Sequence, residues 1–118
     1  MAVPNETVLG PVLDYDLAMQ RVGGDTELLK ELGQLFQEEY PRLMAELRAA
    51  HQQGDAKQVE RAAHGLKGSI ANFGAKRAVD AASQIEQLGR GGSLSPVAEL
   101  LQSLDLALQA LQRELAQL

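Results

Sequence analysis

Apolar residues recur along most of the chain at spacings of three and four, the period of an amphipathic helix, and no stretch alternates as a half-buried strand would. Residues 1–12 have no sustained period and are expected to form a tail or linker. The pattern then predicts five helices, over residues 14–22, 26–53, 56–73, 76–88 and 96–118. We therefore expect an all-α domain over residues 13–118: an antiparallel up-and-down four-helix bundle with a short N-terminal lid helix.

Small polar side chains mark the expected starts of three of these helices. Asp25 and Asp55 are each placed to accept a hydrogen bond from a backbone N–H of the first turn. Gln58, three residues after Asp55, would complete a capping box. Ser95 is expected to cap the last helix, with Pro96 at its first position, where proline is well tolerated.

Proline and glycine mark the expected irregularities. Pro41 lies inside the helix over residues 26–53, where it removes one backbone hydrogen bond. Because the apolar stripe resumes in phase after Pro41, we expect a kink there and not a break. The Gly-Arg-Gly-Gly stretch at residues 89–92 predicts a turn between the last two helices.

The apolar stripes define the expected core. Helix by helix they comprise Leu28, Leu32, Leu35, Phe36, Leu43 and Leu47; Val59, Ala62, Ala63, Leu66, Ile70 and Phe73; Val79, Ala82, Ile85 and Leu88; and Val97, Leu101, Leu104, Leu108, Leu111, Leu115 and Leu118. The last set alternates steps of four and three, which makes a heptad seam. An intermolecular coiled coil would also use this seam. Packing within the bundle is favoured because the other three helices need a partner face too.

The composition is that of one soluble globular domain: 118 residues, 45% hydrophobic and 23% charged. The formal net charge of −5 argues against nucleic-acid binding, which would require a basic patch. The chain has no cysteine, so it can form neither a disulfide nor a thiolate metal site. It contains no signal-peptide pattern and no apolar run of about 18 residues. We expect a cytoplasmic monomer that does not enter a membrane.

One stretch, Ala63-His64-Gly65-Leu66-Lys67-Gly68-Ser69, departs from ordinary helix design. At about 100° per residue, His64 lies roughly 160° from the centre of the apolar stripe and faces water. Lys67 and Gly68 follow at i+3 and i+4, so they share its face. Gly65 and Gly68 each destabilise a helix interior by about 0.5–1 kcal/mol relative to alanine. One interpretation is that another molecule has to come close to the imidazole.

An exposed imidazole beside an ammonium group has a chemical use. Neutral imidazole is a nucleophile at about pH 7, and the ammonium of Lys67 would stabilise an anion attached to His64. Phosphorylation of His64 fits, because a phosphoryl group needs a cationic neighbour and access from outside. The alternative is a solvated histidine beside a solvated lysine, the commoner arrangement on an arbitrary helix. The two glycines weaken that alternative.

These residues also resemble a known motif. The matching positions are His64, Leu66-Lys67-Gly68-Ser69, Asn72, Gly74-Ala75 and Ile85-Glu86. They follow the pattern AH-x-LKGS-x-x-N-x-GA, with a Leu/Ile-Glu pair on the next helix, of bacterial histidine-containing phosphotransfer (HPt) domains. The resemblance covers about residues 14–118. It departs from the family at Gly65, where Thr or Ser is common.

The resemblance implies a histidine phosphotransfer module of a two-component phosphorelay. His64 would accept a phosphoryl group at Nε2 from the phosphoaspartate of a response-regulator receiver domain, such as that of a hybrid sensor kinase. A second receiver would then accept it, while Lys67 screens the phosphate charge. The Mg²⁺ of that exchange belongs to the receiver. The chain itself is expected to bind no cofactor or metal and to have no ATP-dependent kinase activity.

Polar residues of the following helix are expected near His64. Counting ten residues back and ten forward from the turn at residues 74–76 brings Gln84, Glu86 and Gln87 roughly level with His64. One of them would hydrogen-bond the imidazole or a docking partner. Glu86 matches the family's Leu/Ile-Glu pair, and a solvated carboxylate is its equally weighted alternative. The predicted docking surface for a receiver comprises Gly65, Gly68, Ala71, Gln84, Glu86 and Gln87.

Two other functions are compatible with parts of this pattern. A non-catalytic helical bundle could serve as a receiver-binding or dimerisation adaptor, but the glycine beside His64 favours phosphotransfer. Glu60 lies four residues before His64 and could share a metal ion with it, but two ligands do not make a site. The chain has no P-loop, kinase nucleotide motif or GxSxG elbow, which argues against an ATP-binding or hydrolytic site.

Overall fold

The structure is a computed structural model that describes residues 10–118. Over these residues it contains helices and no strands, which confirms the predicted all-helical class. The helices are α2 (Tyr15–Arg21), α3 (Thr26–Gln52), α4 (Ala56–Ala71), α5 (Lys76–Gly91) and α6 (Val97–Leu115). Most of the tail predicted over residues 1–12 lies outside the described residues.

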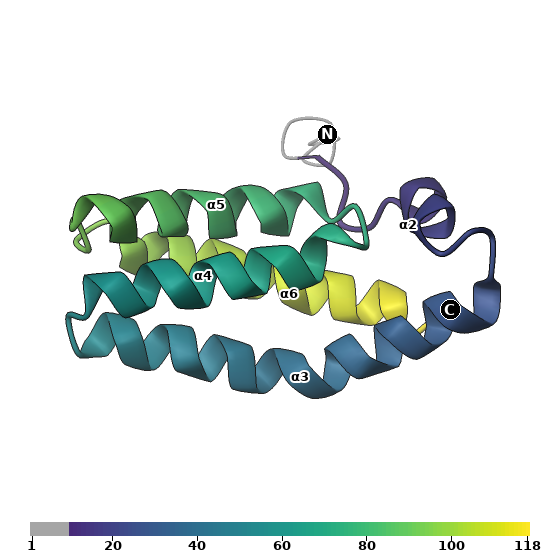
Figure 1. Cartoon of the computed structure of the whole chain (residues 1–118), viewed down its shortest axis with the longest axis horizontal. Coiled ribbons are helices and arrows are strands. Elements are labelled where there is room, and N and C mark those ends of the chain that lie inside the picture. The colour runs from purple at the N-terminus through teal and green to yellow at the C-terminus, as the bar shows by residue number, and fades with distance from the viewer. Residues whose placement is uncertain (1–9) are drawn as a thin grey trace, which may run out of the picture.

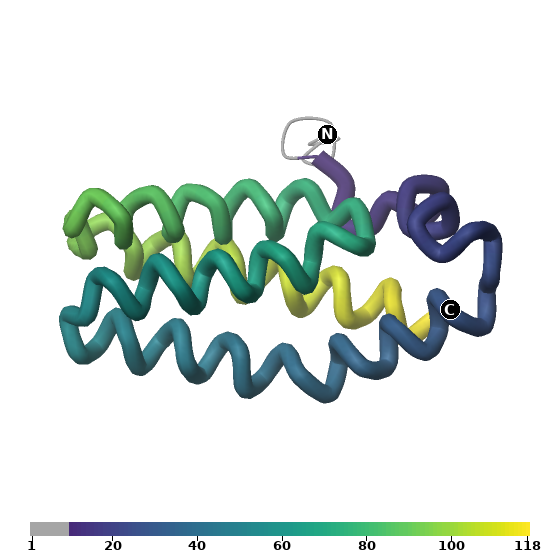
Figure 2. Tube along the Cα trace, viewed as in Figure 1, coloured from purple at the N-terminus to yellow at the C-terminus, as the bar shows by residue number. Residues whose placement is uncertain are grey.

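The four long helices lie side by side, and the chain runs back and forth along the long axis of the molecule (Figure 1). Each long helix packs against the next in sequence, and α3 also contacts α6. Helix α3 continues through Pro41 as one helix. Its trace bends in the middle (Figure 2). The bend agrees with the predicted kink, because proline removes one hydrogen bond of the helix ladder.

The helix starts follow the predicted caps in two of three cases. Asp25 and Asp55 each accept a hydrogen bond from the backbone N–H three residues later, at 3.0 and 3.1 Å. The capping box with Gln58 is not formed, because the Asp55 N–H donates to the carbonyl of Ala50 instead. Ser95 makes no cap either: α6 begins two residues later at Val97, whose N–H donates to the Leu94 carbonyl.

The predicted turn at residues 89–92 begins too early in the sequence. Helix α5 continues to Gly91, and its C-cap residue is Gly92, which has a left-handed φ of 77°. The N–H groups of Gly92 and Ser93 donate to the carbonyls of Gly89 and Leu88, so the last turn is satisfied by its own backbone. Arg90 therefore lies in the last turn of helix α5 and not in a loop.

The core lies between the four long helices. Its largest fully buried side chains include Leu47, Val59, Leu66, Ile70, Ile85, Leu104, Leu108 and Leu111. The heptad seam of α6 is buried within the single chain from Val97 to Leu115, as favoured from the sequence. None of the described helices is both long enough and apolar enough to cross a membrane.

The stripe predicted for α3 is partly out of phase. Leu28 and Leu35 are 39% and 48% exposed, while Leu29 and Met44 are buried. Apolar residues cover a wider arc of α3 than the core can enclose. The spacing of apolar residues alone does not determine which edge of this arc faces the neighbouring helices.

Residues 10–14 pack over the turn between α4 and α5, next to α2 (Figure 1). Ala18 of α2 is fully buried, and the Asp14 N–H donates to the Phe73 carbonyl at 3.0 Å. Val12, which was assigned to the tail, is also buried in the core. The Arg77 N–H donates to the carbonyl of Pro11, which ties this segment to the start of α5.

Candidate functional site

His64 lies on the outer face of α4, as its angular position predicted. Its side chain is 70% exposed, whereas Ala63 and Leu66 beside it are fully buried. Lys67, one turn further along, is 30% exposed. The two side chains reach α5 on the same side, where both contact one carboxylate.

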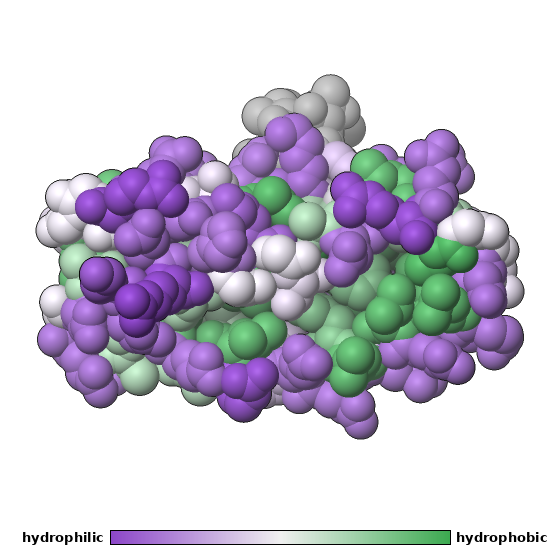
Figure 3. Space-filling view, viewed as in Figure 1, coloured by the Kyte–Doolittle hydropathy of each residue, from purple (hydrophilic) through white to green (hydrophobic). Residues whose placement is uncertain are grey.

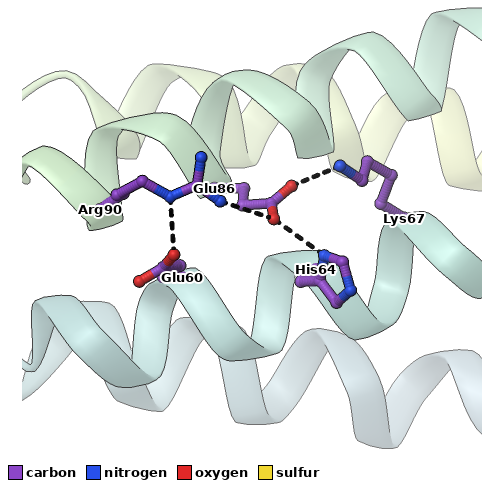
Figure 4. A network of polar contacts seen from close by, with 5 residues as sticks. All are labelled: Glu60, His64, Lys67, Glu86 and Arg90. Carbon is purple, nitrogen blue, oxygen red and sulfur yellow. Dashed lines mark hydrogen bonds and ion pairs between the residues drawn. The ribbon is translucent and has the colours of Figure 1, made fainter.

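That carboxylate belongs to Glu86 of α5, whose side chain is only 5% exposed (Figure 4). Its Oε2 lies 2.8 Å from Nδ1 of His64, and its Oε1 accepts a hydrogen bond from Nζ of Lys67 at 2.5 Å. Nη2 of Arg90 donates to Oε2 at 3.3 Å. The solvated alternative for Glu86 is therefore wrong. One of the three predicted polar residues does bind the imidazole.

Glu86 is held in its ionised form. The hydrogen bond from Lys67 is the main cause that lowers the pKa of the Glu86 carboxyl below its usual value. Burial works in the opposite direction, and the hydrogen bond with His64 lowers the pKa further. A buried charge is tolerated here because each carboxylate oxygen has at least one partner.

The ionised carboxylate sets the proton position on His64. A carboxylate only accepts hydrogen bonds, so the contact at 2.8 Å requires Nδ1 of His64 to carry the proton. In the neutral ring Nε2 then has a free lone pair. Figure 4 shows the second ring nitrogen on the side away from Glu86. The arrangement therefore directs a nucleophilic nitrogen outward and fixes the ring through the other nitrogen.

An ion pair between α4 and α5 was missed in the sequence. Nε of Arg90 donates to Oε2 of Glu60 at 2.8 Å (Figure 4). Glu60 thus pairs with Arg90, and no group of three or more metal-ligating side chains occurs within residues 10–118. The signal was present, because Arg90 lies four residues after Glu86 and Glu60 four before His64. With the helix predicted to end at Leu88, Arg90 falls in a turn, and its pairing with Glu60 is not predicted.

The surface beside His64 is open at both glycines. A Cβ built on Gly65 or on Gly68 would meet nothing within 4 Å outside its own helix. Packing inside the molecule therefore gives no reason for a missing side chain at either position. Ala71, one turn after Gly68, is half-buried on the same helix.

Gln84 and Gln87 do not contact the imidazole. Both are exposed and line a groove between α5 and α6, together with Leu100 and Ser103. Gln84 lies two residues before Glu86 and Gln87 one residue after it, so the helix turns them away from the direction of Glu86 by about 200° and 100°. Their predicted part in docking stays a prediction.

An apolar groove lies on the other side of the open surface, between α3 and α4. It is lined by Leu32, Leu35, Phe36, Glu39, Ser69, Asn72 and Phe73. Hydrophobic residues gather on this face toward the end that carries α2 and the first half of α3 (Figure 3). Ser69 borders the groove and donates to the Gly65 carbonyl at 3.3 Å, so it has a local structural contact.

Comparison with known proteins places this geometry in a family. The model of the Hpt domain family matches residues 31–114, which include α4 and α5 entirely. The crystal structure of histidine-containing phosphotransfer protein B (HptB) from Pseudomonas aeruginosa PAO1 has a similar fold, with a TM-score of 0.85 and 23% identity. The match covers 92% of this chain and 94% of that one. No curated protein matches the chain. Because the family model covers more than half of the sequence, the chain belongs to the Hpt domain family.

Proposed function

We propose that this chain is a phosphotransfer module that carries a phosphoryl group on His64 between receiver domains. The observation that supports it best is the contact of Nδ1 with the buried, ionised Glu86, at 2.8 Å. It leaves Nε2 as an exposed, unprotonated nitrogen on an otherwise open helix face. Membership of the Hpt domain family supports the same function.

The proposed step is a displacement at phosphorus. The Nε2 lone pair of His64 attacks the phosphorus of a receiver's aspartyl phosphate, a P–N bond forms, and the P–O bond to the aspartate breaks. The aspartate leaves as a carboxylate with the bonding electrons. The ring then carries a positive charge, which the Nδ1–H shares with Glu86. In the second transfer an aspartate of another receiver attacks, and the ring recovers its lone pair.

Lys67 is proposed to stabilise the phosphoryl group. Its ammonium lies one turn from His64 and is bound to Glu86 at 2.5 Å, so it is already directed to the same side as the ring. A fixed cation near the transferred group stabilises the charge that develops there. We propose that the Mg²⁺ of the exchange is held by the receiver. The chain then needs no metal, cofactor or ATP of its own.

The proposed docking surface is the outer face of α4. Gly65 and Gly68 leave its backbone uncovered beside the imidazole, and Ala71 continues the same face with a small side chain. A receiver has to bring its aspartate within a few ångströms of Nε2, which large side chains here would prevent. We propose that this face is presented by a monomeric, antiparallel up-and-down four-helix bundle formed by α3–α6, with α2 as its lid.

The test is phosphoryl transfer from phosphorylated receiver domains to the whole chain and to His64→Gln. Wild type should take up label that is labile in acid and stable in alkali, as expected of phosphohistidine. His64→Gln should fold and take up none. His51→Gln removes the other histidine and should behave as wild type. Label on His64→Gln, or label from ATP without a kinase and receiver, would contradict the proposal.

A further inference from the structure

At Gly89, helix α5 lies directly against the backbone of α4. A Cβ built on this residue would lie 2.7 Å from the backbone nitrogen of Glu60 and 2.9 Å from the carbonyl oxygen of Ala56. Both are backbone atoms of α4, which cannot turn aside as a flexible side chain can. Among the glycines in the described helices, Gly33, Gly65, Gly68 and Gly91 make no comparable contact. Any larger residue at position 89 must therefore push the two helices apart.

This contact lies within one turn of the polar site. Gly89 is three residues after Glu86, and the Glu60 backbone it touches is four residues before His64. Three hydrogen bonds cross between the helices here: His64–Glu86 and Glu60–Arg90 are each 2.8 Å long, and Lys67–Glu86 is 2.5 Å long (Figure 4). A hydrogen bond of this kind weakens once its length exceeds about 3.2 Å. A displacement of half an ångström at Gly89 would stretch either 2.8 Å bond beyond this length and weaken it.

We propose that Gly89 is a positioning residue for His64. Its missing side chain sets the separation of α4 and α5 at which Glu86 reaches Nδ1, and the Arg90–Glu60 ion pair holds the same separation from the surface. Through Glu86 this contact keeps the proton on Nδ1 and leaves Nε2 free. The inference deepens the proposed function, since the free Nε2 matters only if it is the phosphoryl acceptor.

The test reads the proton position on His64 directly. Imidazole ¹⁵N spectra of the whole chain at about pH 9, where a histidine carries one proton, distinguish Nδ1–H from Nε2–H. Wild type should have mainly Nδ1–H at His64. Gly89→Ala should shift the population toward Nε2–H, as Glu86→Gln should. Gly91→Ala makes the same change on the same helix in open space and should keep the wild-type spectrum. His51 serves as an internal reference.

A second variant covers the case in which Gly89→Ala does not fold, as judged by circular dichroism. Glu60→Gln removes the ion pair with Arg90, leaves Gly89 in place, and should shift the proton in the same direction by a smaller amount. A folded Gly89→Ala with the wild-type proton position would overturn the inference. If Gly89→Ala is unfolded, a wild-type proton position in Glu60→Gln would overturn the inference.

The outcome is separable from that of phosphotransfer, because the spectra involve no phosphate. A shifted proton in Gly89→Ala, with no phosphoryl uptake by wild type, would uphold the positioning role and refute the proposed function. Phosphoryl uptake by wild type, with an unshifted proton in folded Gly89→Ala, would uphold the proposed function and refute the positioning role. Phosphoramidate, a small donor that needs no docking, should label folded Gly89→Ala more slowly than Gly91→Ala.

Discussion

Glycine occupies two very different regions of this molecule. On the outer face of α4, Gly65 and Gly68 border open space, and a side chain at either would meet nothing within the chain. On the inner side, Gly89 of α5 lies against the backbone of α4, where a Cβ would be 2.7 Å from the nearest atom. Helix propensity disfavours all three to a similar degree. Close packing therefore explains the glycine at position 89 and does not explain those at positions 65 and 68.

The difference separates two requirements of one site. The inner region brings Glu86 against His64 and so fixes the ring and its proton. The outer region leaves the other side of the ring accessible to a partner. A substitution in the inner region should change the state of the imidazole, and one in the outer region should leave the imidazole unchanged and alter what can approach it.

Gly68→Gln should fold and yet slow transfer from a receiver sharply. The new side chain would stand on the exposed face one turn from His64, where we propose that the receiver docks. Phosphoramidate should still label His64 in this variant, because the imidazole is unchanged. Gly68→Ala is the matched control and should lose little transfer activity. Transfer at the wild-type rate in Gly68→Gln would mean that nothing docks over Gly68.

Lys67→Ala should leave a slower but competent acceptor. Lys67 lies between the two regions, since it binds the inner Glu86 and is still 30% exposed. Its removal takes away charge stabilisation and not the nucleophile, so we expect transfer to slow on the order of 10²-fold. Single-turnover transfer measures this. Lys57→Ala, in the first turn of the same helix, controls for the lost charge. Equal rates for Lys67→Ala and wild type would remove Lys67 from the site.

The outer region could be predicted from the sequence, and much of the inner one could not. His64 and Lys67 were found because the spacing of residues within one helix determines which of them share a face. The register of a short hairpin brought Glu86 level with His64, but it brought Gln84 and Gln87 there too and did not decide which of the three contacts the ring. Gly89 and Arg90 were assigned to a turn, because glycines near a helix end ordinarily mark its C-cap. The distance between two helices decides the role of Gly89, and a one-dimensional pattern does not contain it.

The stability that Glu86 contributes should fall in acid. Because its pKa is lowered in the folded state, the contribution is fully present above the ordinary glutamate pKa, about 4.3, and is lost as the pH falls through the lower folded value. Protonation weakens the contacts with Lys67, His64 and Arg90. Hydrogen bonds to charged groups contribute about 1.5–3 kcal/mol.

Urea unfolding of wild type and Glu86→Gln between about pH 7 and pH 3 measures this contribution. The difference in unfolding free energy should be largest near neutrality and should shrink below about pH 4.3. Glu31→Gln, on the exposed surface of α3, controls for the loss of one carboxylate. A difference that is independent of pH would show that the charge of Glu86 does not matter to folding.

Alanine at the two kinds of glycine should change stability in opposite directions. Gly65→Ala adds a side chain in open space and reduces the freedom of the unfolded chain, so it should raise the free energy of unfolding by about 0.5–1 kcal/mol. Gly89→Ala gains the same propensity but forces a Cβ into the α4 backbone. Overpacking of this kind destabilises by about 1–3 kcal/mol, and we expect a net loss. Urea unfolding of both variants at neutral pH gives the two signs.

If both alanines stabilise the protein, α4 and α5 separate at little energetic cost and Gly89 imposes no distance on the site. If both destabilise it, the outer glycine has a structural role that its open surroundings do not explain. Opposite signs would establish that stability requires glycine at position 89 and does not require it at position 65.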